Sequence, residues 1–182
     1  MSRKVGVKHP QLIVRTVSAS RTRGWLEYGP FRWPCALGRS GIRASKREGD
    51  GATPMGTFQL RQAYYRPDAV RRAGTALALR PLRSAMGWCD APQDRNYNRA
   101  VRLPYPASTE RMWRNDRLYD LVIVLGHNDR PRVRGGGSAI FIHVARPGYQ
   151  PTEGCIALRR DHLKLLLSCL KRGAVLRCRS RR

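Results

Sequence analysis

A histidine and a cysteine lie twelve residues apart in the segment FIHVARPGYQPTEGCIAL, residues 141–158. His143 ends an apolar run that predicts a strand, and Cys155 follows Gly154 in a predicted turn. A thiolate is a strong nucleophile, and a neighbouring imidazole can accept the thiol proton. Spacing alone leaves two interpretations open: a catalytic pair, or a core histidine and an ordinary buried thiol. If Cys155 is catalytic, we expect its sulfur to be exposed and its pKa to be depressed. We also expect the backbone amides of Gly154 and Cys155 to point at a developing oxyanion.

Apolar runs separated by turns predict a mainly β chain that would position this pair. One further segment, residues 84–110, is polar and rich in Pro and Asn, and it predicts a long loop that is functional or mobile. The expected strands are residues 11–17 and 23–29 as a hairpin, 33–42 near an edge because of Pro34, 56–66, 75–81, 119–128, 138–145 and 174–178.

One helix is predicted near the C-terminus. Asp161 is expected to cap its start and Gly173 to end it. Its apolar face is expected to consist of four leucines, Leu163, Leu166, Leu167 and Leu170.

The chain of 182 residues predicts a single domain, residues 1–182. No apolar run is long enough to cross a membrane, and the N-terminus shows no recognisable secretory signal. The five cysteines cannot all pair within one chain, and no Cys/His set has metal-ligand spacing. We therefore expect no metal site, and structural roles for the four other cysteines, Cys35, Cys89, Cys169 and Cys178.

The net charge of +24 comes from 31 arginines and only five lysines. A field of this sign concentrates polyanions near the surface. The arginines are scattered along the chain, however, and a GC-rich genome raises arginine content without any partner. The charge therefore indicates an affinity for polyanions without selecting nucleic acid.

Four segments occur in the order found in one family. They are SAIFIHVARPGYQPTEGCIAL (138–158), KREGDGATPMGTFQL (46–60), GWCDAPQDRNYN (87–98) and RLYDLVIVLGHN (117–128). Together they resemble the catalytic domain of the L,D-transpeptidase (YkuD-like) family, over a motif-bearing core of about residues 38–170. The resemblance implies an L,D-transpeptidase-like β-sandwich with a packed C-terminal helix. The motif at 46–60 is expected to be structural, with Asp50 capping its turns.

The resemblance also implies roles for the three residues of the opening segment. Cys155 is the acyl-accepting nucleophile and His143 its base, and the amides of Gly154 and Cys155 form the oxyanion hole. Many members have a histidine directly before the Gly-Cys, where this chain has Glu153. Glu153 then either binds the amine of an acceptor or is simply solvated.

Further residues are expected to bind substrate. His127 and Asn128 lie at a strand end, where His127 either donates to the oxyanion, orients His143 or is structural. On the loop between base and nucleophile, Arg146, Tyr149 and Thr152 are placed to contact substrate. Arg146 is a carboxylate partner or a solvated side chain, and the same alternatives hold for an arginine further on, Arg159.

The implied reaction is peptidoglycan L,D-transpeptidation: acyl transfer from one stem peptide through Cys155 to the amine of another stem or of an amino acid. Two alternatives stay open, an L,D-carboxypeptidase-type cysteine hydrolase and a non-catalytic basic nucleic-acid-binding module. We expect no metal or organic cofactor, stem peptides rather than nucleic acid as partners, and a monomer. A periplasmic location follows from the reaction.

Overall fold

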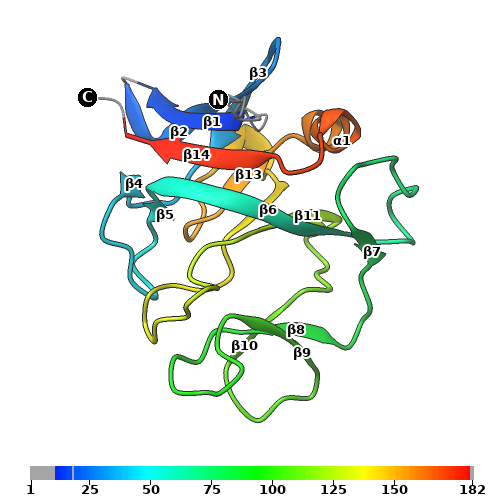
Figure 1. Cartoon of the computed structure of the whole chain (residues 1–182). Coiled ribbons are helices and arrows are strands. Elements are labelled where there is room, and N and C mark those ends of the chain that lie inside the picture. Colours follow the sequence, from blue (N-terminus) through cyan, green and yellow to red (C-terminus); the bar gives the residue numbers. More distant parts are fainter. Residues whose placement is uncertain (1–10, 18, 181–182) are drawn as a thin grey trace, which may run out of the picture.

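The computed structural model describes residues 11–17 and 19–180, and the fold is mainly β, as predicted (Figure 1). The strands are β1 (Gln11–Val17), β2 (Ser20–Tyr28), β3 (Phe31–Ala36), β4 (Ile42–Arg43), β5 (Thr53–Pro54), β6 (Gly56–Tyr65), β7 (Leu79–Pro81), β8 (Met86–Cys89), β9 (Arg99–Arg102), β10 (Thr109–Arg111), β11 (Leu121–Leu125), β12 (Phe141–Val144), β13 (Ile156–Leu158) and β14 (Val175–Arg179). The helices are a 3-10 turn, η1 (Pro147–Tyr149), and α1 (Arg160–Cys169).

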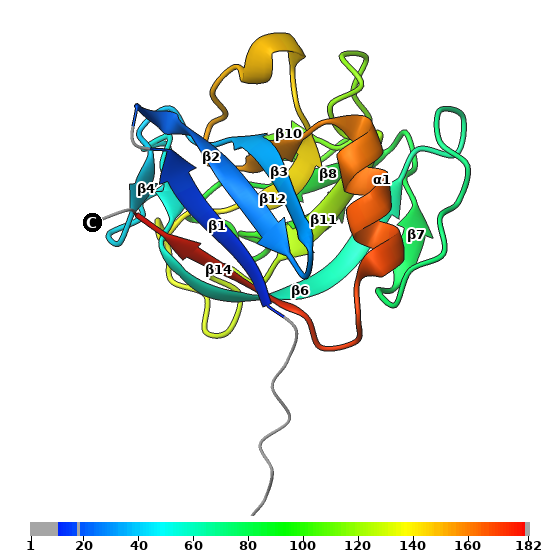
Figure 2. The ribbon, with the colours of Figure 1, turned by 90° about the horizontal axis from the view of Figure 1, so that it is seen from above.

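The main sheet curls upon itself. Its nine strands run in the order β11-β12-β13-β3-β2-β1-β14-β6-β7, and β6 pairs with β11 as well as with β14. Because β6 also pairs with β11, the strands from β11 to β6 close into a ring, and β7 extends from it. The two layers expected of a sandwich are therefore opposite walls of one continuous sheet (Figure 2). The predicted hairpin is confirmed as β1 and β2.

The central strand β11 is buried on both of its faces, which explains why residues 119–128 form an almost unbroken apolar run. Leu121 and Ile123 belong to the main core, which α1 also covers. Val122 and Val124 point into a second apolar cluster on the other face of the sheet. That second cluster is where the candidate site lies.

Helix α1 presents the predicted leucine face to the main core. Leu163, Leu166 and Leu167 are fully buried, and each contributes about 1.5–3 kcal/mol through the removal of apolar surface from water. The predicted ends are wrong. Arg159 occupies the N-cap without a side-chain cap, while Asp161 lies inside the first turn and pairs with Arg159 at 2.8 Å. The helix has ended by Cys169, before the turn that contains Gly173.

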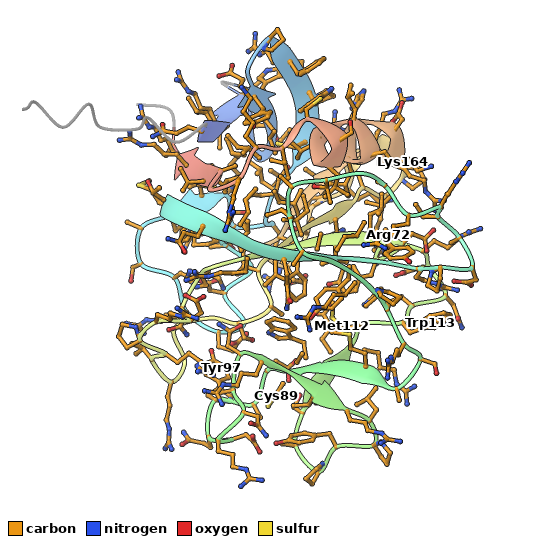
Figure 3. The ribbon with its side chains drawn as sticks, turned by 45° about the vertical axis from the view of Figure 1, so that its right-hand side comes forward. Arg72, Cys89, Tyr97, Met112, Trp113 and Lys164 are labelled. Carbon is orange, nitrogen blue, oxygen red and sulfur yellow. The ribbon has the colours of Figure 1, made fainter. Side chains whose placement is uncertain are left out.

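The segment predicted as a long loop, residues 84–110, forms most of a second sheet instead. Strands β10, β8 and β9 pair in that order and stand apart from the main sheet in Figure 1. Between the two sheets lies the second apolar cluster, in which Met112 is fully buried (Figure 3). The strands are short and polar, so their long-range pairing leaves no clear periodicity in the sequence.

Several predicted strands are shorter in the structure, among them 119–128, reduced to β11, and 138–145, reduced to β12. The run at 75–81 contributes only β7, and the run at 33–42 continues β3 only to Ala36. The expected edge position of this run is wrong, because β3 lies between β2 and β13, although only the single pair Ala36–Ala157 joins it to β13. In the described part of the chain, no helix has the length and apolar character needed to span a membrane. The expectation about a secretory signal concerns mainly residues 1–10, which lie outside the described residues.

Candidate active site

Strands β12 and β13 place the histidine and the cysteine on one face of the sheet. They pair in parallel, with Ile142 opposite Ile156 and His143 opposite Ala157. Side chains alternate between faces along a strand, so Ile142 and Ile156 point into the main core. His143 and Cys155 point the other way and line one cavity of about 550 Å³.

The sulfur of Cys155 is held between two backbone groups. The N–H of Phe141 donates to Sγ at 3.3 Å, and the thiol donates to the carbonyl of Ala139 at 3.2 Å. Cys155 is only 8% exposed. These contacts orient the sulfur towards the cavity and provide one donor for a thiolate when it forms.

A backbone contact determines the tautomer of His143. Its Nδ1 lies 2.9 Å from the carbonyl oxygen of Val144, which can only accept, so Nδ1 carries the proton. The neutral ring therefore keeps its lone pair on Nε2, the form needed by a general base. The edge of the imidazole packs against the ring of Tyr119, with centroids 5.2 Å apart.

Burial keeps both groups neutral. Burial first, and the Glu110 carboxylate second, raise the pKa of Cys155 to about 12. Burial also lowers the pKa of His143 to about 4. The expected exposed sulfur with a depressed pKa is therefore wrong. The free protein therefore holds a neutral thiol and a neutral imidazole on the wall of one cavity.

Thr152 fixes the turn that carries the cysteine. Its hydroxyl donates to the carbonyl of Cys155 at 2.6 Å and accepts from the N–H of Gly154 at 3.2 Å. The amide of Gly154 thus already has an acceptor, and its place in an oxyanion hole stays a prediction. Gly154 has φ +133°, and a Cβ there would lie 2.7 Å from the carbonyl oxygen of Ala52.

The motif at 46–60 supports this turn, which confirms its structural role. Asp50 accepts hydrogen bonds from Lys46 at 2.6 Å and from the amides of Arg47 and Ala52 at 2.8 Å each. These bonds fix the loop whose Ala52 carbonyl lies against Gly154.

A buried asparagine from the motif at 87–98 connects the small sheet to the site. Asn98 accepts from the indole N–H of Trp88 at 3.0 Å and from the amide of Ala139 at 3.2 Å. Its Nδ2 donates to the carbonyls of His127 and Asn128, both at 2.9 Å. Asn98 therefore helps to place Ala139, the acceptor of the Cys155 thiol.

The family of this chain follows from comparison with known proteins. The YkuD family of L,D-transpeptidase catalytic domains matches residues 14–177, which is most of the chain. The chain belongs to the YkuD family.

Two solved structures resemble this YkuD domain. Mycobacterium tuberculosis L,D-transpeptidase 1 is 11% identical, with a TM-score of 0.40 over 92% of this chain and 58% of that chain. An L,D-transpeptidase from Mycobacterium smegmatis is 13% identical, with a TM-score of 0.42 over 93% of this chain and 59% of that one. The chain thus spans less than two thirds of the length of either protein. No curated protein matched it.

The cavity of this YkuD domain gathers some of the predicted substrate residues. Arg146, Thr152 and Glu153 line it together with Cys155 and His143. Arg146 lies 3.6 Å from Asp116. Glu153 forms an exposed ion pair with Arg39 at 2.8 Å.

Other predicted residues lie elsewhere. Tyr149 and Arg159 line a neighbouring depression around η1. His127 is not among the residues that line the cavity, and its Nε2 donates to the carbonyl of Gly136 at 2.9 Å. Asn128 closes its own loop through bonds to Val133 at 2.7 and 2.9 Å. Substrate binding by these four residues stays a prediction.

Sequence reasoning missed a polar network on the cavity wall. Tyr119 donates to Glu110 at 2.5 Å, and Arg114 lies 3.6 Å from the same carboxylate. Burial raises the pKa of Glu110, and burial raises the pKa of Tyr119 well above its usual value. Glu110 lies on β10, within the segment expected to be a loop. In the sequence, the one feature that could have drawn attention to Glu110 is that it is an isolated carboxylate in a strongly basic chain.

Proposed function

We propose that this chain is a peptidoglycan L,D-transpeptidase in which Cys155 is the nucleophile and His143 its base. The observation that carries the proposal is the shared cavity, into which a hydrogen-bonded thiol and a neutral imidazole with a free Nε2 both face. Membership of the YkuD family supports the assignment of the reaction. Peptidoglycan stems carry both the carbonyl that is attacked and the amine that resolves the intermediate.

The first step forms a thioester. Sγ of Cys155 attacks a peptide carbonyl of the donor stem while its proton passes to Nε2 of His143. The amide of Phe141, already 3.3 Å from Sγ, stabilises the negative charge on sulfur as that proton leaves. The C–N bond then breaks, and His143 returns the proton to the departing amino group.

The second step transfers the acyl group. A neutral amine of the acceptor attacks the thioester carbon and gives a proton to His143. As the C–S bond breaks, that proton returns to the sulfur. The products are a new amide and the free thiol, so the cycle consumes no cofactor. Water in place of the amine gives hydrolysis of the same thioester.

Mass spectrometry of muropeptides tests the proposal. A mixed pool is incubated with the protein or with Cys155→Ala, and the expected result is new dimers or exchanged stems only with the intact thiol. Shortened monomers alone would instead assign a carboxypeptidase. Identical pools in both samples would contradict either reaction.

The proposed substrate also defines where the protein acts. Peptidoglycan is cross-linked outside the cytoplasm, so we infer a periplasmic site of action. Cell fractionation with an antibody against this chain tests that inference, and recovery with cytoplasmic markers alone would contradict it.

A further inference from the structure

Carboxylates gather at the cavity of a chain that is otherwise strongly basic. The sequence has only 12 acidic residues against 36 basic ones, yet four carboxylates and two guanidiniums line this cavity. The carboxylates are Glu48, Asp90, Glu110 and Glu153. In a chain with net charge +24, such a wall favours a cation inside the cavity over the anions that the exterior attracts.

Two buried polar atoms on this wall have no partner with full hydrogen-bond geometry within the described chain. Ser138 is 6% exposed, and its hydroxyl has no partner with full hydrogen-bond geometry, although it lies close enough to the Tyr97 hydroxyl to oppose the rise in the pKa of Tyr97. Oδ1 of Asp90 is buried and has no such partner either. Both residues line the cavity beside Cys155. Buried polar groups are normally satisfied, so these two atoms indicate a polar ligand that completes them.

The carboxylates differ in how far protein cations neutralise them. Arg39 pairs with Glu153, and Arg114 approaches Glu110 at 3.6 Å. No ion pair in the described part of the chain involves Glu48 or Asp90. Glu48 instead accepts from the hydroxyl of Tyr97 at 2.5 Å. Negative charge on this wall is therefore left for a ligand to neutralise.

Glu110 is the carboxylate most closely connected to the reacting groups. It accepts from Tyr119, whose ring packs against the imidazole of His143. After burial, the Glu110 carboxylate is the largest cause that raises the pKa of Cys155, which places it within electrostatic reach of the sulfur. A cation bound at Glu110 therefore lies in the same cavity as the sulfur that would carry the thioester.

We propose that Glu110 and Asp90 bind the protonated amine of the acyl acceptor, with the Ser138 hydroxyl as a further acceptor of its N–H groups. The inference rests on the proposed transpeptidation and assigns the amine-binding half of its cavity. It makes the preferred acceptor a side-chain or terminal ammonium rather than water or an uncharged nucleophile.

The bound ammonium must lose a proton before it reacts. One proton passes from the ammonium to a wall carboxylate, which leaves a neutral amine beside the thioester carbon. The nitrogen then forms the C–N bond while its second proton passes through His143 to the departing sulfur. Burial raises the pKa of Glu110, which makes it a better proton acceptor than an exposed carboxylate.

Partition of the acyl-enzyme between two nucleophiles tests the inference. The protein is acylated with a tetrapeptide stem and resolved either by a stem tripeptide that bears a side-chain ammonium or by hydroxylamine, which is uncharged at neutral pH. Glu110→Gln keeps an acceptor for Tyr119 and removes the charge. Asp90→Asn does the same at the second position.

We expect each variant to raise the tripeptide concentration for half-maximal cross-linking at least about tenfold, since a charge-assisted contact is lost. Resolution of the preformed acyl-enzyme by hydroxylamine is expected to stay within about twofold of the wild type. The acylation step is measured separately for each variant, because the Glu110 carboxylate acts on the pKa of Cys155. The matched control is Glu27→Gln. Glu27 lies on β2, outside the cavity, and its carboxylate pairs with Arg32 of β3. This control is expected to leave resolution of the acyl-enzyme by the tripeptide and by hydroxylamine unchanged.

Two results would overturn the inference. One is an unchanged tripeptide dependence in both variants, and the other is an equal loss with both nucleophiles, which would indicate a structural role. Calorimetric binding of the tripeptide to Cys155→Ala, with and without Glu110→Gln, tests amine binding without any chemistry. Absence of an acyl-enzyme on wild-type Cys155 would reject the transpeptidation itself, whereas equal tripeptide affinity with and without Glu110→Gln would reject the amine site alone.

Discussion

The backbone N–H of Phe141 points at the sulfur of Cys155 from 3.3 Å. The two residues come from neighbouring segments of the same sheet, so the donor is rigid and needs no reorganisation when charge develops on sulfur. At rest the thiol donates a hydrogen bond to the Ala139 carbonyl, and the sulfur and this oxygen are 3.2 Å apart. In the proposed reaction, substrate and His143 together activate this neutral thiol.

The first prediction concerns the reactivity of this thiol. Because burial raises the pKa of Cys155 to about 12, its alkylation by iodoacetamide is expected to be slow at neutral pH. The rate should still be rising above about pH 9, where an ordinary free thiol has largely ionised. Peptide mass spectrometry follows Cys155 separately from the partly exposed Cys169. A plateau already reached near neutral pH would show a thiolate at rest.

The second prediction concerns acid stability. The pKa of His143 is about 4 in the folded protein against an ordinary 6.5, so the unfolded chain binds more protons between these values. The free energy of unfolding is therefore expected to fall as the pH drops from 6.5 to about 4. This single group contributes about 3 kcal/mol to that loss.

The matched variant is His143→Asn, which cannot titrate. Urea unfolding at a series of pH values should show a shallower acid loss in the variant than in the wild type. Curves of equal slope would mean that His143 is not buried as a neutral ring. In activity, the same variant is expected to lose at least about 100-fold through removal of the base.

The third prediction compares two glycines with positive φ, only one of which has a neighbouring atom where a Cβ would lie. Gly154→Ala would place a Cβ 2.7 Å from the Ala52 carbonyl at φ +133°. We expect it to displace Cys155, lower activity strongly and cost about 1–3 kcal/mol. Gly148→Ala also adds a Cβ at positive φ, +71°, but meets nothing within 4 Å.

Thermal melts and turnover of the two variants provide the measurement. Gly148→Ala should lose some stability and keep its turnover, while Gly154→Ala should lose both. Equal turnover in the two variants would show that the contact with Ala52 does not position the nucleophile.

The fourth prediction concerns the asparagine between the two sheets. Asn98→Ala would leave the indole N–H of Trp88 and the amide of Ala139 without their acceptor. We expect a loss of about 2 kcal/mol or more in unfolding free energy, since buried donors become unsatisfied. Turnover should also fall because the Ala139 carbonyl, which accepts the hydrogen bond of the Cys155 thiol, would be displaced.

Asn96→Ala is the control from the same segment, where the side chain donates to Tyr105 at 2.8 Å near the surface. Chemical denaturation and turnover of both variants give the comparison. Wild-type turnover in Asn98→Ala would separate the Ala139 carbonyl from catalysis.

Local patterns predict much of this fold and little of its cavity. The apolar run around β11 and the leucine face of α1 are visible in sequence because each repeats with the period of its element. The carboxylates of the cavity wall leave no such pattern in the sequence. Glu110 and Asp90 share a cavity with Cys155 only in the folded chain, where short polar strands pair over a long range. Burial of Cys155 likewise depends on residues distant in sequence, which is why its pKa was expected to shift in the opposite direction.

The residues of the two proposed roles in the cavity, reaction and amine binding, come from separate segments of the chain. Strands β12 and β13 position the proposed base and nucleophile, His143 and Cys155, whereas Glu110 and Asp90 lie in the segment between β7 and β11. Substitutions in that segment can change which amine is preferred while the β12–β13 register is untouched. On the proposed assignment, the preference for an acceptor amine can therefore be changed by substitution without altering the reacting residues on β12 and β13, and the same pair could act on a range of acceptors.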